Sequence, residues 1–134
     1  MTVEKTLSII KPDAVADKIA GKIIDMIENA DLNIVKMKKM HFDTDLAQRF
    51  YDVHKERPFY NDLVDFMVSG PVVVMELEGE NAIANYRNIM GATNPSEASP
   101  ESIRGKYASS IDKNCVHGSD ATDTAAYELG LIFG

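Results

Sequence analysis

The junction that follows the first predicted strand constrains the fold of this chain more than any other feature. Thr6-Leu7-Ser8-Ile9 alternates polar and apolar residues as a strand does, and Pro12 marks the end of that pattern. A parallel doubly wound sheet would need a glycine-rich phosphate turn here, whereas the chain continues with Lys11-Pro12-Asp13. Neither a GxGxxG pattern nor a Walker lysine motif occurs in the sequence. The sequence therefore disfavours a parallel doubly wound fold.

Hydrophobic periodicity predicts an alternation of strands and helices along the rest of the chain. An apolar stripe at helical spacing predicts a helix over residues 18–30, and Val35 and Met37 alternate with lysines as in a strand that is solvated on one side. A short helix follows, with Leu46, Phe50 and Val53 on one face and Tyr51 pointing away from that face. The remaining predicted elements are a helix over Phe59–Val68, a central strand at Val72–Met75 and a helix from an Asn81 cap to about Met90. A last strand lies around His117, and a last helix follows it.

This order of elements predicts an α+β fold, a ferredoxin-like βαββαβ sandwich with a four-stranded antiparallel sheet. A helix pair is inserted between its second and third strands, and a long loop, Gly91–Ser110, precedes its last strand. A loop of about 20 residues in so small a domain is usually functional or disordered. Because this loop contains Thr93 and Arg104 and leads to His117, we interpret it as functional. We expect one domain over residues 1–134.

Composition limits the class of protein. The chain has 134 residues, 45% of them hydrophobic, which suffices for one domain with a substantial core. Its net charge of −7 argues against a protein that coats DNA or RNA, because such binding depends on neutralising phosphates. The single cysteine favours a reducing compartment. Met1–Ile10 lacks a signal-peptide pattern and no segment approaches the ~20 apolar residues of a membrane span, so we expect a soluble, cytoplasmic protein without membrane contact.

The segment Asn114-Cys115-Val116-His117-Gly118-Ser119-Asp120 places an imidazole at the end of a short apolar run. Gly118 allows a tight turn beside the ring, and Asp120 stands where the N-cap of the last helix is expected. A histidine held by such neighbours is a candidate nucleophile. The alternatives are a structural histidine at a strand end, or a zinc ligand beside Cys115 if both point to the same side of an extended segment. Zinc usually needs four ligands, and the remaining histidines are only His41 and His54.

Other residues suit the binding of an anionic ligand, although each has a structural alternative. Arg87 and Arg104 flank the long loop, and their planar forks match phosphate oxygens unless they are ordinary surface cations. Lys11 follows the first strand, where ligand contacts often lie. Phe59 could stack on a flat ligand or act as a hydrophobic staple for its helix. Glu128 falls on the inward face of the last helix, where a carboxylate needs a partner such as His117 unless it reaches water.

The motifs of this chain, taken in sequence order, resemble those of nucleoside diphosphate kinases from end to end. The matching segments are Ile10-Lys11-Pro12-Asp13-Ala14-Val15, Arg57-Pro58-Phe59-Tyr60, Leu63-Val64, Ser69-Gly70-Pro71-Val72, Gly91-Ala92-Thr93-Asn94-Pro95, Ile103-Arg104-Gly105 and the segment Asn114–Asp120, which is the family signature. Lys106 departs from the pattern, because many relatives carry an acid there. The chain ends soon after the last helix, so it resembles the short, bacterial-type members.

The resemblance implies a reaction and a set of site residues. The γ-phosphate of a nucleoside triphosphate would move to His117, and then from phosphohistidine to a nucleoside diphosphate, in a ping-pong mechanism. The implied catalytic set is His117, Glu128, Ser119 and Lys11, with Ser119 and Glu128 orienting the ring. The implied substrate contacts are Arg87, Thr93, Arg104 and Tyr51 around the phosphates, Lys11 and Asn114 at the sugar, and Phe59 on the base with Leu63 and Ile111 beside it.

The resemblance also implies the cofactor and the assembly. Mg²⁺ would arrive with the nucleotide and take its ligands from phosphates and water, so no protein metal site is expected. The partners would be nucleoside di- and triphosphates rather than a nucleic acid polymer. We expect a homo-oligomer built from dimers, either a tetramer or a hexamer. The strand around Val35–Met40 should lie at a sheet edge, where its unpaired backbone groups could pair with a second copy.

Two other classes of function are weighed against the enzyme. A nucleotide-binding regulatory module could keep the fold without turnover, but the complete set of chemical positions argues against that loss. An RNA-binding ferredoxin fold would need a basic sheet face with exposed aromatic residues. This chain is acidic and contains no tryptophan. The sequence therefore favours an enzyme that balances nucleoside triphosphate pools.

Overall fold

Strands and helices alternate along the part of the chain that the computed structural model describes, residues 3–111 and 113–134. The strands are β1 (Val3–Ile10), β2 (Asn33–Met40), β3 (Val72–Glu80) and β4 (Val116–Gly118). The helices are α1 (Pro12–Ala16), α2 (Ala20–Asn29), α3 (Thr44–Phe50), α4 (Tyr60–Met67), α5 (Ala82–Met90), α6 (Ile103–Tyr107) and α7 (Thr122–Phe133), with short 3-10 turns η1 (Asp52–His54) and η2 (Pro95–Glu97). Every strand and long helix expected from the sequence is present.

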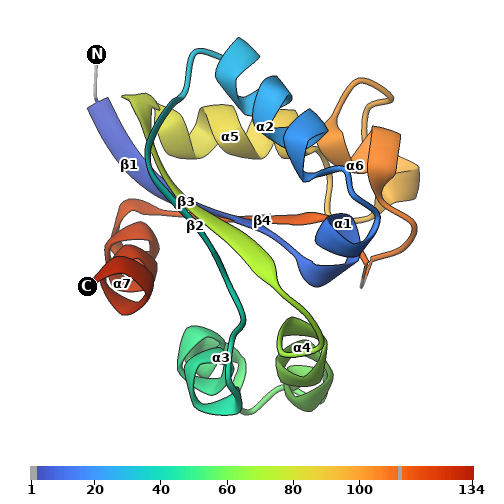
Figure 1. Cartoon of the computed structure of the whole chain (residues 1–134), viewed down its shortest axis with the longest axis vertical. Coiled ribbons are helices and arrows are strands. Elements are labelled where there is room, and N and C mark those ends of the chain that lie inside the picture. The colour runs from blue at the N-terminus through green and yellow to red at the C-terminus, as the bar shows by residue number, and fades with distance from the viewer. Residues whose placement is uncertain (1–2, 112) are drawn as a thin grey trace.

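The strands form one antiparallel sheet in the order β2-β3-β1-β4 (Figure 1). This order is that of a ferredoxin-like sandwich, and the predicted α+β class is confirmed. Strand β1 lies inside the sheet, while β2 and β4 form its two edges. The edge position predicted for the second strand is therefore correct. Ile9 of β1 pairs with His117 of β4, so the candidate nucleophile lies on the short edge strand.

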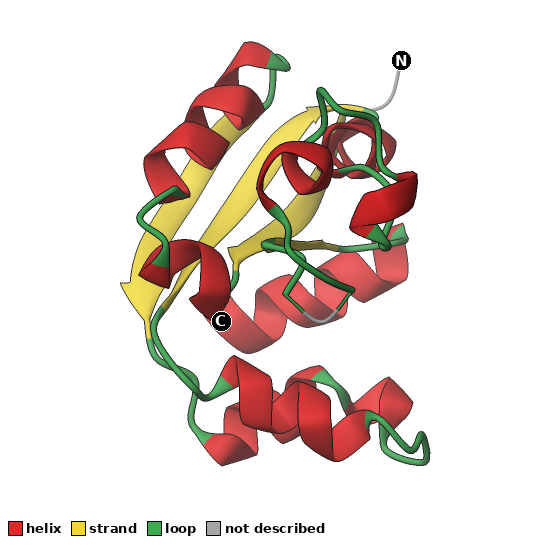
Figure 2. Cartoon of the chain, turned by 90° about the vertical axis from the view of Figure 1, so that its right-hand side faces the viewer, coloured by secondary structure: helices red, strands yellow, loops and turns green. Residues whose placement is uncertain are grey.

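Helices cover both faces of the sheet, as Figure 1 shows, with α2, α5 and α6 on one face and α3, α4 and α7 on the other. Alternate residues of β1 supply the two hydrophobic cores, because successive side chains of a strand point to opposite faces. Ile10 packs in the core with α2 and α5, and Leu7 and Ile9 pack in the core with α3, α4 and α7. Figure 2 shows that the α3–α4 pair extends from one end of the sheet. None of the helices in the described ranges is long and apolar enough to cross a bilayer.

The prediction for the residues around Tyr51 is wrong. Helix α3 ends at Phe50, and the chain continues as the 3-10 turn Asp52–His54 instead of completing another α-helical turn. The 3-10 turn has a different angular spacing, so the expected apolar face is interrupted after Phe50. Tyr51 is buried with 7% of its surface exposed, whereas Val53 is 76% exposed.

The loop Gly91–Ser110 contains more regular structure than its sequence indicated. It includes the turn Pro95–Glu97 and the helix α6. The Asn94 side chain accepts from the backbone N–H of Ser96, and Ser102 caps α6 by accepting from the N–H of Gly105. These short capped elements have too few residues to display a hydrophobic period, which explains why periodicity did not reveal them.

Two helix starts differ from the simple caps that the sequence indicated. The N-cap of α7 is Ala121 rather than Asp120, and the Asp120 carboxylate accepts a hydrogen bond from the Thr124 hydroxyl at 2.7 Å. Asn81 is the N-cap of α5 as predicted, but its side chain makes no capping bond. Glu4 of β1 instead accepts from the N–H of Ile83.

Strand β2 is exposed on both faces for most of its length. Its pairing with β3 shifts register between Ile34 and Lys36, which leaves Val35 as an extra residue in a bulge. Val35 and Met37 are 46% and 55% exposed, so the side expected to be buried is largely uncovered in the single chain.

Candidate active site

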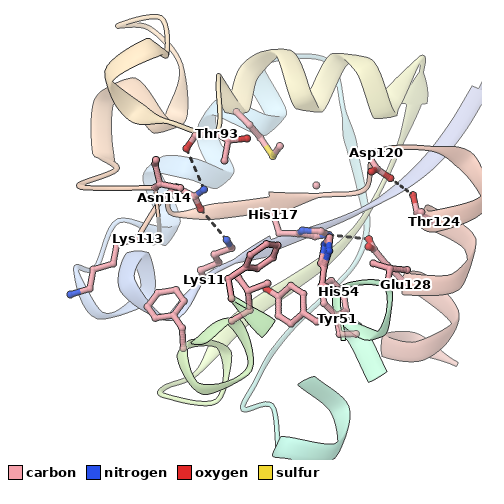
Figure 3. Close-up of a pocket in the computed structure, with 18 of the residues that line it drawn as sticks. Lys11, Tyr51, His54, Thr93, Lys113, Asn114, His117, Asp120, Thr124 and Glu128 are labelled. Carbon is pink, nitrogen blue, oxygen red and sulfur yellow. Dashed lines mark hydrogen bonds and ion pairs between the residues drawn. The ribbon is translucent and has the colours of Figure 1, made fainter. Parts of the chain in front are cut away.

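A pocket of about 800 Å³ lies between strand β4, the α3–α4 pair and the loop before β4 (Figure 3). The residues that line it include most of the predicted site: Lys11, Tyr51, Phe59, Leu63, Arg87, Thr93, Arg104, Ile111, Asn114, His117 and Glu128. Segments from both ends of the chain thus contribute to one cavity, whose size suits a drug-sized or cofactor-sized ligand.

His117 is held from two sides at the pocket wall. Its Nε2 lies 3.0 Å from Oε1 of Glu128, on helix α7. Its ring meets the ring of Phe50 edge-to-face, with the centroids 4.9 Å apart. The side chain keeps 22% of its surface exposed, so the ring is both fixed in orientation and reachable from the pocket.

Ser119 lies behind the pocket and supports Glu128. The Ser119 hydroxyl donates to Oε1 of Glu128 at 2.7 Å, which is the same oxygen that contacts His117. The hydroxyl oxygen in turn accepts the backbone N–H of Leu7 at 3.2 Å. The Glu128 side chain is only 12% exposed and has the partner that its inward position required. A continuous chain of hydrogen bonds therefore connects β1 to the imidazole.

Gly118 allows helix α5 to approach strand β4 closely. A Cβ atom at this position would lie 2.8 Å from the Tyr86 ring and 3.0 Å from the Met90 sulfur. Tyr86 is fully buried, and its hydroxyl is 2.6 Å from that of Ser8 in β1. This packing brings the neighbouring Arg87 to the pocket, where its Nη1 donates to the Gly118 carbonyl at 3.5 Å.

The Arg104 side chain is held in place by hydrogen bonds to the protein backbone. Its guanidinium donates to three backbone carbonyls, those of Asn114 at 3.3 Å, Gly91 at 3.0 Å and Val116 at 2.9 Å. Burial lowers the pKa of Arg104, although nearby Tyr86 opposes that effect. Because a guanidinium carries five N–H donors, the three bonds leave two for a ligand. Arg104 therefore braces the loop on which Asn114 lies as well as facing the pocket.

Lys11 and Asn114 form a pair at the pocket. The Lys11 ammonium donates to Oδ1 of Asn114 at 2.9 Å, and the Asn114 amide donates to the Thr93 carbonyl at 3.4 Å (Figure 3). The Lys11 backbone N–H also donates to the carbonyl of Cys115. The end of β1 is thereby tied to the segment that leads into β4.

The opposite end of the pocket is apolar and open. Phe59 precedes helix α4 and is 45% exposed, and Ile111 on the loop before β4 is 55% exposed. Leu63, one turn into α4, lines the same region. Large apolar side chains that remain this exposed beside a cavity provide a surface for a flat ring.

Several pocket residues were not identified from the sequence as ligand contacts. Phe50 and His54 are two of them, and they join the predicted Tyr51 and Phe59 in a run of aromatic side chains along the wall from His117 to the mouth. Burial raises the pKa of Tyr51, and the negative charge of Glu128 adds to the effect, so its phenol stays protonated and can donate. Asp120 also lines the pocket, and the Thr124 hydroxyl lowers the pKa of its carboxyl. Only the spacing of aromatic residues after Phe50 could have indicated the wall.

The geometry at Cys115 does not match the alternative in which Cys115 and His117 are zinc ligands on one extended segment. Strand β4 begins at Val116, and Cys115 has a left-handed backbone with φ 74°, so it is not part of an extended segment with His117. The thiol is buried, and burial raises its pKa to about 12, whereas a zinc ligand must be a thiolate. In residues 3–111 and 113–134, no group of three or more His, Cys, Asp or Glu side chains could hold a metal ion.

The chain matches a family model described as "Nucleoside diphosphate kinase" over residues 4–134. Among curated proteins, it is 59% identical over 133 residues to a nucleoside diphosphate kinase from Nitrosococcus oceani, covering 99% of this chain and 93% of the relative. It is 58% identical over 130 residues to the enzyme of that name from a Nitratiruptor species, with 97% and 95% covered.

Solved structures agree with these relatives. The nucleoside diphosphate kinase of Aquifex aeolicus superposes with a TM-score of 0.97 at 44% identity, covering 99% of this chain and 96% of that one. The enzyme from Encephalitozoon cuniculi superposes with a TM-score of 0.95 at 34% identity, with 98% and 89% covered. Fold and relatives together define a phosphotransferase. The chain belongs to the nucleoside diphosphate kinase family, whose members transfer the γ-phosphate of a nucleoside triphosphate to a nucleoside diphosphate.

Proposed function

We propose that residues 1–134 form one catalytic domain in which His117 carries the phosphoryl group between the two nucleotides. In the first half-reaction, a ring nitrogen of His117 forms a bond to the γ-phosphorus, the bond to the β–γ bridging oxygen breaks, and the diphosphate leaves with that electron pair. In the second half-reaction, a terminal oxygen of another nucleoside diphosphate attacks the phosphohistidine and the P–N bond breaks. The observation that carries this proposal is the fixed, accessible imidazole of His117 in a pocket with two arginines.

The attacking atom is Nδ1 in this proposal. Nε2 faces the Glu128 carboxylate at 3.0 Å, and that hydrogen bond needs a proton on Nε2. The tautomer with a proton on Nε2 leaves the lone pair on Nδ1. Glu128 also offsets the positive charge that the ring gains when Nδ1 bonds to phosphorus, as the acidic partner of a catalytic histidine does elsewhere. Ser119 keeps the same carboxylate oxygen in place.

The phosphates would lie among Arg87, Arg104, Thr93 and Tyr51. Phosphoryl transfer needs little covalent chemistry from a protein beyond in-line placement and stabilisation of charge on the equatorial oxygens. Two guanidiniums provide that charge, with the remaining N–H groups of Arg104 directed by its carbonyl contacts. The protonated phenol of Tyr51 adds a neutral donor near His117.

The sugar and the base would occupy the rest of the pocket. Lys11 and Asn114, which already contact each other, offer an ammonium and an amide to the sugar hydroxyls. Phe59 would stack on one face of the base, with Leu63 and Ile111 beside it. A stacking surface of this kind tolerates every base, because each base has a π-face.

Mg²⁺ would enter with the nucleotide and not through a protein cage. The carboxylates along the pocket are on separate elements: Glu128 is engaged with His117 and Ser119, Asp120 accepts from Thr124, and Asp62 lies on helix α4. This donor set fits an ion whose ligands are phosphate oxygens and water. When bound, the ion supplies partial neutralisation of the phosphate charge.

The assembly and the cellular location are also proposals. A homo-oligomer built from dimers, a tetramer or a hexamer, is supported by the exposed edge strand β2 with its uncovered Val35 and Met37. A cytoplasmic location rests on the single cysteine, which is buried.

The experiment that tests the catalytic proposal is transfer of label to the protein. The purified chain is mixed with γ-labelled ATP and Mg²⁺, without acceptor. Phosphohistidine is labile in acid and stable in alkali, so the label should disappear in acid, survive in alkali and move to added nucleoside diphosphate. A label that is stable in acid would contradict the proposal.

A further inference from the structure

The last turn of helix α7 is fastened to the edge strand β2. The Lys38 ammonium donates to the Ile132 carbonyl at 3.0 Å and lies 5.2 Å from the centroid of the Phe133 ring. The Lys36 ammonium lies 5.7 Å from the same ring. The last four carbonyls of a helix have no intrahelical partner, and a cation at that end also interacts favourably with the helix dipole. Lys38 therefore donates to a carbonyl, that of Ile132, which has no partner within the helix.

Helix α7 also carries the carboxylate that contacts His117. Ile132 is four residues after Glu128, so the two lie on one face of the helix, one turn apart. Oε1 of Glu128 must reach both Nε2 of His117 and the hydroxyl of Ser119, at 3.0 and 2.7 Å. A rotation of the last turn would alter both distances at once, and misplacement by about 1 Å can cost a large part of a catalytic rate.

We propose that Lys38 is a positioning residue, which holds α7 in the orientation that places Glu128 on His117. This inference rests on the proposed function, since it takes Glu128 as the residue that orients the imidazole. Lys38 lies at the far edge of the sheet from β4, and it acts through the helix without contact with the nucleotide.

The neighbouring Lys39 provides a matched control. Lys38 pairs with Val74, whose side chain belongs to the core beneath α7, whereas Lys39 pairs with Val73, which packs against the opposite core. The two lysines share strand, charge and length, but they point to opposite faces of the sheet. A general effect of charge on β2 would appear in both variants, and a positioning effect only in one.

The first test measures the rate of His117 phosphorylation by γ-labelled ATP in a rapid-quench experiment, and ADP affinity by calorimetry. Lys38→Met should phosphorylate roughly three- to tenfold more slowly, with the ADP dissociation constant within about twofold of the wild type. Lys38→Arg retains a donor and should restore most of the rate, and Lys39→Met should match the wild type. Equal rates for Lys38→Met and Lys39→Met would overturn the inference.

The second test places Lys38→Met in a Glu128→Gln background. If Lys38 acts through Glu128, the effect of Lys38→Met should largely disappear there, because coupled residues are not additive. The same fold-loss in both backgrounds would assign Lys38 a merely structural role and reject the inference. If Glu128→Gln alone keeps the wild-type rate, the proposed role of Glu128 fails and the premise falls with it. If Glu128→Gln phosphorylates slowly and Lys38→Met phosphorylates at the wild-type rate, the inference about Lys38 is rejected and the proposed role of Glu128 stands.

Discussion

Glu128 contacts His117 through one pair of atoms, Oε1 and Nε2, at 3.0 Å. A carboxylate in this position determines which ring nitrogen carries the proton, and so which nitrogen is free to react. The contact joins the shortest strand of the sheet, β4, to the last helix, α7.

Replacing Glu128 by Gln should slow the formation of phosphohistidine at least tenfold, about 1.4 kcal/mol in the activation barrier. The amide has the same shape but lacks the charge that stabilises the phosphorylated ring. Nucleotide affinity should remain within about twofold, because Glu128 faces the imidazole. Pre-steady-state quench-flow measures the rate and calorimetry the affinity. A normal rate would show that the carboxylate merely fills a boundary position.

His117→Ala should abolish the acid-labile phosphoprotein and leave nucleotide binding intact. His54→Ala and His41→Ala are the matched controls, since His54 lines the same pocket and His41 contacts the Val68 carbonyl instead. Both control proteins should still become labelled. Autoradiography after acid and alkali treatment checks this, and label on His41 or His54 in the His117→Ala protein would exclude the mechanism.

The enzyme should discriminate weakly among bases. Phe59 offers a stacking surface, and stacking of this kind is available to every base. The values of kcat/KM for ATP, GTP, CTP and UTP as donors should therefore lie within roughly a hundredfold, about 2.7 kcal/mol. A larger spread would show that a side chain of the pocket contacts a base edge specifically.

Gly118→Ala should destabilise the fold by about 1–3 kcal/mol, because the added methyl would overlap the Tyr86 ring and the Met90 sulfur. Gly130→Ala is the opposite case. Gly130 lies inside helix α7 with nothing within 4 Å of an added Cβ, so alanine should stabilise by roughly 0.5–1 kcal/mol. Urea unfolding compares the two variants, and equal midpoints would contradict the close packing of α5 on β4.

The chain should assemble into a homo-oligomer built from dimers through the β2 edge. Light scattering coupled to size exclusion at micromolar concentration measures the mass. Met37→Glu, which places a charge on an exposed apolar position of β2, should shift the distribution towards smaller species. A monodisperse wild-type monomer of 14.8 kDa would rule out the prediction.

The fold was predictable because periodicity and element order are properties of the sequence itself. The strand pattern at Thr6–Ile9 and the run at Val72–Met75 became the two central strands, and the apolar stripe over residues 18–30 became α2. The errors occurred where local geometry overrides the period. A 3-10 turn after Phe50 reversed the burial of Tyr51 and Val53, and no hydrophobic pattern announces such a turn.

The candidate site also has a part that the sequence predicted and a part that only the fold determines. Residues named from the sequence, such as His117, Asn114 and Arg87, do line one pocket. Their partners could not be inferred, because backbone carbonyls occur at every residue and only the fold selects which of them meet Arg104. The connection from Lys38 to the end of α7 is equally invisible in the sequence, since it joins positions 94 residues apart.

The order β2-β3-β1-β4 places the two edges of the sheet at opposite ends of its width. Three strand spacings of ~4.8 Å separate β2 from β4, so the strand of a second copy paired with β2 would lie four spacings, about 19 Å, from the strand that bears His117. Growth of the sheet across the β2 edge therefore extends away from the mouth of the pocket. Assembly through β2, as predicted above, would therefore leave the β4 edge open to the entry and release of nucleotides.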